Sequence, residues 1–176
     1  MLTRIALVEP LAVAWHAVDA TYIEKGDDAL VLGAGPIGLG VIQCLKARGA
    51  NQIFVAEVAA ERQNFAKHFG ATHIFDPTKE DVVARCKELT GGRGPQIALD
   101  CAGVAASIKT ATLAVRARGR IVNVAIWEKV RKESKAVTLA LTKHRRSHST
   151  PTIWFSGRRS ILRVCVAFLN DLMIVH

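Results

Sequence analysis

Short apolar runs alternate with helix-like segments between residues 29 and 126, and glycines or polar turns separate most of them. Continuous apolar runs of this length are typical of strands that are buried on both faces. The segments between them repeat apolar residues three and four positions apart, as a helix with one buried face does. The pattern predicts strands at 29–32, 52–58, 73–75, 97–101 and 120–126, and helices at 10–21, 36–48, 59–69, 79–90 and 105–115.

Strands that alternate with helices through short connections form parallel sheets with helices on both faces. The predicted fold class is therefore α/β, a Rossmann-type doubly wound parallel sheet preceded by one extra helix. The alternation stops after residue 126. We therefore expect the sheet to be incomplete at its C-terminal end, with an unpaired edge at its last strand.

Charge divides the chain at the same place. The whole chain has 24 Lys and Arg against 15 Asp and Glu, a net charge of +9. Residues 1–127 carry 14 basic and 12 acidic side chains, whereas residues 128–176 carry 10 basic and 3 acidic ones. We predict a folded domain at 1–127 and a basic tail at 128–176 whose structure the sequence does not define.

The tail raises two further function classes. Its arginines, with Trp154 and Phe155 among them, are compatible with nucleic-acid binding, but no nucleic-acid-binding motif accompanies them. We interpret the tail as a solvated extension and expect no nucleic-acid partner. No apolar stretch reaches the roughly 18 residues that span a bilayer, so we expect no membrane segment.

Residues 33–38 read Gly-Ala-Gly-Pro-Ile-Gly, a G-x-G-x-x-G motif between a predicted strand and a predicted helix. In this context Gly33 allows a sharp turn, Gly35 lets a pyrophosphate approach the backbone, and Gly38 lets the helix lie close to the strand. The helix N-terminus would then face the phosphates with its N–H groups and its positive dipole end. The motif predicts a dinucleotide-binding turn; the alternative is a glycine-rich turn that binds no nucleotide.

Glu57 ends the second predicted strand, 19 residues after Gly38. A carboxylate at this position can accept hydrogen bonds from both hydroxyls of the adenosine ribose, and it repels a 2′-phosphate. Arg62 follows five residues later and could pair with a 2′-phosphate. With Glu57 present, we assign Arg62 to the rim of the ribose or adenine and predict NAD(H) as the cofactor.

Cysteines and a histidine are the other candidate reactive groups. The cysteines lie far apart without a C-x-x-C pair, so we predict neither a local zinc knuckle nor a redox motif. We interpret them as reduced thiols of a cytoplasmic protein without a targeting segment. His16 could be a general base, but we interpret it as a helix-packing residue. The cysteines are Cys44, Cys86, Cys101 and Cys165.

Six motifs, in order along the chain, resemble those of the zinc-dependent medium-chain alcohol and polyol dehydrogenases. The resemblance is greatest to the 2,3-butanediol dehydrogenase branch, beside sorbitol dehydrogenase, and runs from about residue 5 to residue 128. It covers the cofactor-binding half of that family. The motifs are EPLAVAWHAV (9–18), VLGAGPIGL (31–39), the strand with Glu57, LTGGRG (89–94), DCAG (100–103) and VNVAIWE (122–128).

The resemblance implies roles for individual residues. Glu57 matches the family's ribose ligand, Arg62 matches its adenosine-side basic residue, and Glu9 matches a carboxylate beside the catalytic zinc. Other matches fall on the pyrophosphate turn, the wall beside the adenosine ribose, and the strand end that lines the nicotinamide. These are Gly33, Gly35, Pro36, Ile37 and Gly38 for the turn, Cys101 and Ala102 for the wall, and Val122, Asn123, Val124 and Ala125 for the strand end.

In that family zinc acts as a Lewis acid on the substrate oxygen while hydride passes to the nicotinamide. The cysteine and the His-Glu pair that hold this zinc have no match in the sequence, nor has the family's four-cysteine structural zinc lobe. Because Glu9 alone does not make a metal site, we assign no catalytic residue. We expect that this chain alone binds no zinc and is inactive.

Three interpretations stay open. The first is the NAD(H)-binding domain of a 2,3-butanediol dehydrogenase-like oxidoreductase, without the catalytic zinc domain. The second is a non-catalytic cofactor-binding or oligomerisation module that forms homo-oligomers or pairs with a full-length subunit. The third is a non-functional gene-model fragment, in which a frame change or a misread exon boundary produced the sequence after Glu128, where the family pattern ends and basic charge rises.

Overall fold

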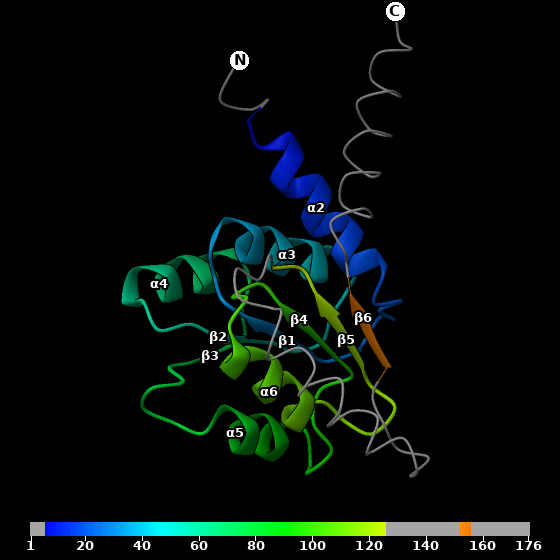
Figure 1. Cartoon of the computed structure of the whole chain (residues 1–176), viewed down its shortest axis with the longest axis vertical. Helices are drawn as coiled ribbons and strands as arrows, with labels where there is room; N and C mark the ends of the chain where they lie inside the picture. Colours follow the sequence, from blue (N-terminus) through cyan, green and yellow to red (C-terminus); the bar gives the residue numbers. More distant parts are fainter. Residues whose placement is uncertain (1–5, 126–151, 156–176) are drawn as a thin grey trace, which may run out of the picture.

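The computed structural model of the chain describes residues 6–125 and, as backbone alone, residues 152–155. Six parallel strands form one sheet, in the order third, second, first, fourth, fifth, sixth (Figure 1). This order reverses between the first and fourth strands, as in a Rossmann fold, so the predicted fold class is confirmed. The strands are β1 (Ala29–Leu32), β2 (Ile53–Ala56), β3 (His73–Phe75), β4 (Ile97–Asp100), β5 (Arg120–Asn123) and β6 (Thr152–Phe155).

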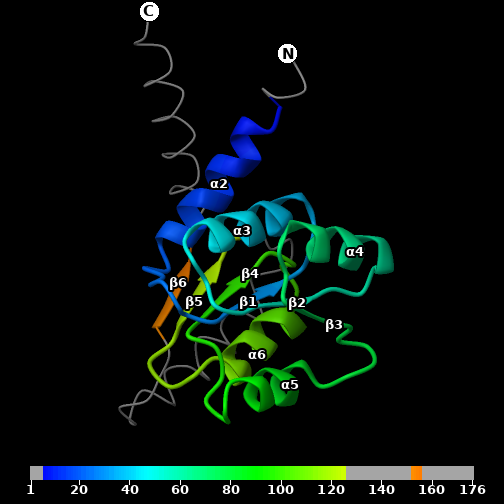
Figure 2. The same ribbon diagram turned by 180° about the vertical axis from the view of Figure 1, so that it is seen from behind.

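Helices cover both faces of the sheet, and their order follows the predicted alternation. Figures 1 and 2 show α2, α3 and α4 over one face and α5 and α6 over the other. All five begin and end within three residues of the predicted bounds. The helices are α2 (Val8–Asp19), α3 (Pro36–Ala47), α4 (Ala60–Phe69), α5 (Val82–Leu89) and α6 (Ala105–Ala114).

Two apolar clusters, one on each face of the sheet, form the core. In β1, Ala29 and Val31 belong to the cluster beneath α2 and α3, whereas Leu30 and Leu32 belong to the cluster beneath α6. Successive strand residues point to opposite faces, so a strand that is covered on both sides has to be apolar at every position. This is why the buried strands appear in the sequence as unbroken apolar runs.

The leading helix α2 packs against α3 through small residues. Ala14, Ala17 and Val18 are buried there, and a Cβ added to Gly40 of α3 would lie 3.0 Å from the Ala14 Cβ. The two helices therefore approach closely. The predicted extra helix is confirmed, and it begins two residues earlier than expected.

β6 is the main difference from the sequence prediction. It pairs in parallel with β5, from Arg120 opposite Thr152 to Asn123 opposite Phe155. The expectation of an unpaired edge at β5 was therefore wrong. Thr, Ile, Trp and Phe all suit strands, but no recognisable rhythm surrounds them in the sequence. The boundary at 127–128, Cys165 and the rest of the predicted tail lie outside the described residues.

Candidate dinucleotide-binding site

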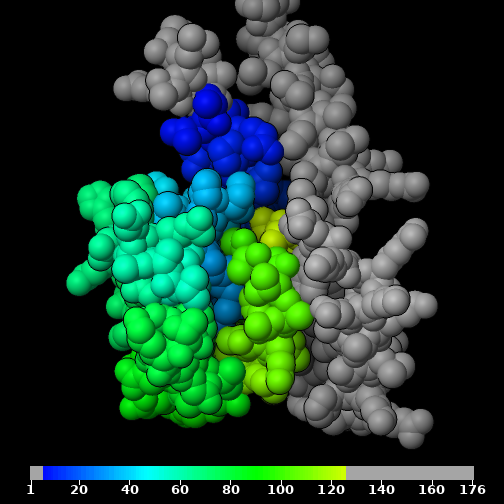
Figure 3. Space-filling model, turned by 60° about the vertical axis from the view of Figure 1, so that its left-hand side comes forward, coloured from blue at the N-terminus to red at the C-terminus, as the bar shows by residue number. Residues whose placement is uncertain are grey.

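The predicted site residues meet at the carboxyl ends of β1, β2 and β4. Beyond the strands, the Gly33 N–H donates to the Ala56 oxygen at 2.8 Å, and the Cys101 N–H donates to the Leu32 oxygen at 2.9 Å. This places Gly33 beside both Glu57 and Cys101. Ligands of doubly wound sheets bind at such an edge, where the strand order reverses. Between the teal atoms of α4 and the green atoms of α6, blue atoms of the part of the chain that leads into α3 are recessed (Figure 3).

Each of the three motif positions requires or suits glycine for a different geometric reason. Gly33 has a φ of +92°, and a Cβ there would lie 3.1 Å from both the Cβ and the N of Ala102. A Cβ on Gly38 would collide with the carbonyl oxygen of Gly33, so helix and turn touch there. A Cβ on Gly35 would meet nothing within 4 Å. Gly35 therefore borders open space, as a turn that receives a pyrophosphate requires.

The N-terminus of α3 has no side-chain cap from the residues that the structure describes. Gly35 is the N-cap residue, Pro36 follows it, and within residues 6–125 no side chain accepts a hydrogen bond from the first turn. The first intrahelical bond joins the Leu39 N–H to the Gly35 oxygen at 2.9 Å. Because helix geometry gives the preceding N–H groups no partner within the helix, Ile37 and Gly38 offer amides to a ligand. These residues fit a bound pyrophosphate.

Glu57 is buried against this turn with 5 % of its surface exposed. One carboxylate oxygen, Oε2, accepts the Ala34 N–H at 2.7 Å, and Oε1 accepts the Val58 and Ala59 N–H groups at 3.0 Å each. The Gln63 side chain donates to the Glu57 main-chain oxygen at 2.6 Å. Sequence reasoning placed Glu57 at this edge but missed these bonds and Gln63. A carboxylate just before a helix start was the available signal for the two local bonds.

Arg62 lies on the first turn of α4, on the side of the edge formed by β2. Its side chain is exposed, and within the described part of the chain it makes no ion pair. The structure therefore does not join it to Glu57. An exposed guanidinium here has the freedom to contact a ligand at the adenosine end.

Asp100 organises the opposite wall. Its buried Oδ1 accepts the N–H groups of Ala102 at 3.1 Å and Gly103 at 3.2 Å, and the Ser107 hydroxyl at 2.8 Å. Cys101 is half-buried and Ala102 is exposed. Cys101 and Ala102 were predicted from the sequence, whereas the roles of Asp100 and Ser107, which hold this wall, were not. The acidic residue at a strand end within the DCAG motif was the signal.

The end of β5 joins the same edge. The N–H groups of Val124 and Ala125 both donate to the Asp100 carbonyl oxygen, at 2.9 and 3.0 Å. Val122, Asn123 and Val124 are buried, and Ala125 is half-buried. The strand end that was predicted to line the nicotinamide therefore lies next to the wall at β4.

The described residues do not bring metal donors together. Glu9 is exposed on α2, and no group of three His, Cys, Asp or Glu side chains within residues 6–125 is arranged to hold a metal ion. The donor set of a zinc site normally comprises three or four such groups. The described residues therefore do not fit zinc, and the predicted position Glu9 has no partners for this role among them.

Three cysteines, of which only Cys101 lies at this edge of the sheet, have raised pKa values and keep their protons at neutral pH. Burial raises the pKa of Cys86 to about 12. Burial, and then the negative charge of Asp100, raise the pKa of Cys101 above its usual range. Burial also raises the pKa of Cys44, while Arg48 acts in the opposite direction. All three carry free thiols rather than disulfides.

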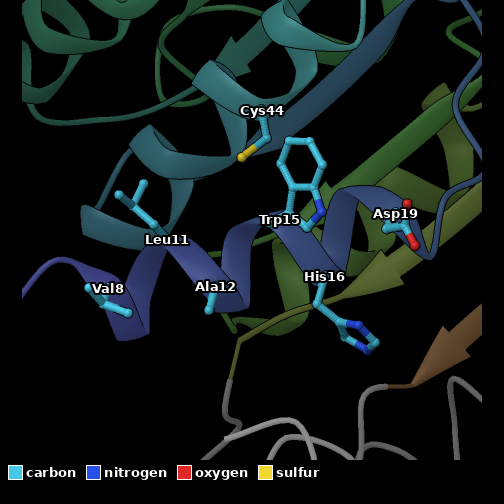
Figure 4. Close-up of a pocket in the computed structure, with 7 residues that line it drawn as sticks. All are labelled: Val8, Leu11, Ala12, Trp15, His16, Asp19 and Cys44. Atoms are coloured by element: carbon cyan, nitrogen blue, oxygen red, sulfur yellow. The ribbon is translucent and has the colours of Figure 1, made fainter. Parts of the chain in front are cut away.

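A separate hollow of about 630 Å³ follows the outer side of α2 (Figure 4). Trp15 and Cys44 face each other there, and the Arg48 guanidinium lies 4.6 Å from the Trp15 ring centre. His16 is exposed and points away from α3, so its interpretation as a helix-packing residue was wrong. The hollow contains none of the predicted cofactor-binding residues. It is lined by Val8, Leu11, Ala12, Trp15, His16, Asp19 and Cys44.

Among the described residues, no helix is both long enough and apolar enough to cross a membrane.

Among known proteins, two relatives of this chain carry the same name. (R,R)-butanediol dehydrogenase of Bacillus subtilis is 47 % identical over 125 residues, which are 70 % of this chain and 36 % of that protein. The Saccharomyces cerevisiae enzyme of the same name is 42 % identical over 125 residues, 69 % of this chain and 32 % of that protein. This chain thus spans about a third of the length of these curated relatives.

Solved structures agree with the sequence relatives. The crystal structure of 2R,3R-butanediol dehydrogenase from Bacillus subtilis superposes with a TM-score of 0.70 at 35 % identity, covering 93 % of this chain and 45 % of that one. A Sinorhizobium meliloti structure with NADP bound gives a TM-score of 0.68 at 28 % identity, covering 90 % and 47 %. The family profile described as zinc-binding dehydrogenase matches residues 36–166. The chain belongs to the zinc-binding dehydrogenase family.

Proposed function

We propose that this chain binds NAD(H) as the cofactor-binding part of a zinc-dependent alcohol or polyol dehydrogenase similar to 2,3-butanediol dehydrogenase. The observation that carries the proposal is the start of α3. There an uncapped helix N-terminus and the open space at Gly35 lie directly beside the buried Glu57 carboxylate. An anion receptor next to an acceptor for sugar hydroxyls suits the phosphates and ribose of a dinucleotide.

In this proposal the turn binds the pyrophosphate, with the Ile37 and Gly38 amides as donors. The Glu57 carboxylate accepts from the adenosine ribose, and its negative charge disfavours a 2′-phosphate. Arg62 contacts the outer rim of the adenosine. The remaining predicted contacts are Cys101 and Ala102 beside the ribose, and Val122, Asn123, Val124 and Ala125 beside the nicotinamide.

NAD, when bound, supplies the hydride acceptor for oxidation of an alcohol. The residues of this chain bind and orient it, and the buried ends of β4 and β5 exclude water from the nicotinamide side. Zinc needs donors that the described residues do not bring together. The oxidation of a diol such as 2,3-butanediol by a protein containing this domain is therefore part of the proposal, supported by its relatives' names.

Cofactor fluorescence tests the proposal. Purified chain should enhance or shift NADH emission with saturation at micromolar to millimolar cofactor, and it should bind NADPH at least tenfold more weakly because Glu57 repels the 2′-phosphate. No change with either cofactor would overturn the proposal. Equal binding of both would overturn the assignment of NAD(H) alone. An assay with 2,3-butanediol, NAD and zinc then tests whether this chain turns over.

Pairing with a second chain is a second candidate function, and the outer face of α2 favours it. Four large apolar side chains at the start of α2 and along it each expose 42–56 % of their surface: Leu7, Val8, Leu11 and Trp15. The last three line the hollow of Figure 4. Exposed apolar patches of this kind mark interaction sites. Light scattering on wild type and on Leu11→Glu would show whether the chain forms a homo-oligomer through this face. Co-purification with a full-length family member tests whether the chain pairs with such a subunit instead.

The proposal also includes a cytoplasmic location, and it has the non-functional fragment as its alternative. Free thiols at Cys44, Cys86 and Cys101 are typical of reducing compartments, which supports a cytoplasmic protein. A non-functional fragment remains the alternative to both binding roles. It predicts no NADH binding, and a transcript that does not encode residues 128–145 in frame.

A further inference from the structure

We propose that Glu57 is a positioning residue for the pyrophosphate turn: its carboxylate ties that turn to the start of α4 and holds it ready for the phosphates. This inference rests on the proposed function. It goes beyond the ribose contact because it assigns Glu57 an effect on a part of the ligand that it does not touch.

The carboxylate bridges two turns that are distant in sequence. Oε2 accepts from Ala34, between β1 and α3, at 2.7 Å, while Oε1 accepts from Val58 and Ala59, between β2 and α4. Glu57 and Ala34 are 23 positions apart. Both groups are buried, with Glu57 5 % and Ala34 0 % exposed. A charged acceptor at this distance makes a strong hydrogen bond, so the two turns are held together.

Fixing Ala34 fixes the turn that the phosphates would enter. Ala34 lies between Gly33, whose φ is +92°, and Gly35, whose side faces open space. The bond from Glu57 orients the peptide between Gly33 and Ala34, and therefore the path of the chain into α3. A turn held in its binding conformation before the ligand arrives loses less entropy on binding.

Counting acceptor positions also limits the ribose contact. An ionised carboxylate offers about four lone-pair positions, and backbone N–H groups use three of those on Glu57. About one position is left for a ribose hydroxyl. Glu57 therefore acts on binding through the turn as well as through the sugar.

Glu57→Gln and a nucleotide without ribose hydroxyls separate these two effects. Glutamine has one oxygen and one NH₂ group, so in either orientation at least one of the three backbone N–H groups loses its acceptor. Calorimetric titration of the full chain with ADP and with 2′,3′-dideoxy-ADP should show both binding about tenfold more weakly to the variant. Unchanged binding of dideoxy-ADP would overturn the positioning role and leave the ribose contact alone.

Thr90→Val is the matched control for stability. The buried Thr90 hydroxyl accepts the Gly94 N–H at 2.8 Å and donates to the Cys86 oxygen at 2.7 Å, at the opposite edge of the sheet from the turn. Its removal costs both of these hydrogen bonds, so the midpoint temperature of thermal unfolding should fall as in Glu57→Gln, while both nucleotides bind as they do to wild type. Equal weakening by the control would show a general loss of stability and overturn the inference.

Two further outcomes keep the inference distinct from the proposed function. Should Glu57→Gln fail to fold, Glu57→Asp replaces it: the shorter carboxylate keeps its charge and its reach to the nearby Val58 and Ala59 amides but is one methylene short of Ala34. It should bind dideoxy-ADP about tenfold more weakly, and unchanged binding overturns the inference. If wild type binds neither nucleotide, the proposed function itself fails, and the inference with it.

Discussion

Two helices, α3 and α5, begin after the carboxyl end of a strand and solve the same problem differently. At α5, the Asp81 carboxylate is the N-cap and accepts the N–H groups of Val83 at 2.9 Å and Ala84 at 3.2 Å. At α3, the N-cap is Gly35, and among the described side chains none accepts a hydrogen bond from the first turn. The Asp81 carboxylate thus satisfies two amides at the start of α5, whereas no side chain of the described residues does so at the start of α3.

The difference shows that the residue at the N-cap decides what a helix N-terminus does. A carboxylate there stabilises the helix by hydrogen bonding and by its charge at the positive end of the dipole. The same carboxylate occupies the donors and repels an anion. At α3 the nearby acid, Glu57, accepts from Ala34 instead, so it supports the turn without blocking the helix end.

Gly38→Ala should have the largest effect on stability and on NADH binding, because it distorts the turn before α3. Its Cβ would collide with the Gly33 carbonyl oxygen, and both groups belong to the backbone, so neither can move without distorting the turn. We expect the free energy of unfolding to fall by about 3 kcal/mol and NADH binding to be lost, as measured by urea unfolding and fluorescence titration. Gly40→Ala, whose Cβ would meet the Ala14 side chain at 3.0 Å, should cost about 1 kcal/mol. Equal stability of Gly38→Ala and wild type would contradict the geometry of the turn.

Gly35→Asp would convert the start of α3 into one like that of α5. Gly35 has an extended backbone with φ −70° and ψ −176°, which any residue adopts, and space for a side chain. The new carboxylate should cap the helix and raise the free energy of unfolding by up to about 1 kcal/mol. NADH affinity should fall about a hundredfold, measured by the same titration. Gly35→Ala separates steric from charge effects, and undiminished affinity of Gly35→Asp would place the phosphates elsewhere.

Asp81→Ala is the converse change at α5. Losing the cap should lower the free energy of unfolding by about 1 kcal/mol, because Val83 and Ala84 lose their acceptor. NADH affinity should stay the same, since α5 takes no part in the proposed site. A weaker affinity in this variant would show that the two helix starts are not independent.

Asp76→Asn should have the smallest effect. Hydrogen bonds from Lys79 and then from Thr78 lower the pKa of Asp76, ahead of α5, to about 2. A carboxyl whose pKa is lower in the folded state contributes stability above its unfolded pKa of about 4 and loses it as the pH falls toward 2. Thermal unfolding of Asp76→Asn should therefore depend less on pH than that of wild type between these values. An unchanged pH profile would contradict this role of Asp76.

The sequence predicted the sheet well where burial alone decides. β1 was predicted with its observed bounds because every residue of a strand covered on both faces contributes to the apolar run. β3 was also predicted with its observed bounds, although His73 and Ile74 are only half-buried. The observed bounds differ from the predicted ones where side-chain carboxylates accept hydrogen bonds from backbone N–H groups. β2 ends at Ala56, two residues earlier than predicted, where the Glu57 carboxylate begins to take the amides, and α5 starts only after Asp81 caps it.

The site was predicted in its parts but not in its connections. Glycine spacing and an acid at a strand end are local signals, so the sequence could single out Gly33, Gly35, Gly38 and Glu57, which the fold brings to one edge of the sheet. The bond between Glu57 and Ala34 joins turns that meet only in the folded sheet, and no local pattern encodes it. The pairing of β6 with β5 is likewise a contact between distant segments.

Amide chemical shifts of the isotope-labelled chain during an NADH titration test the central claim most directly. The account predicts saturable shifts that are largest for the Gly35, Ile37 and Gly38 amides at the start of α3, with small shifts for Val83 and Ala84 at the capped start of α5. Shifts that leave the α3 amides unmoved while NADH binds would contradict it.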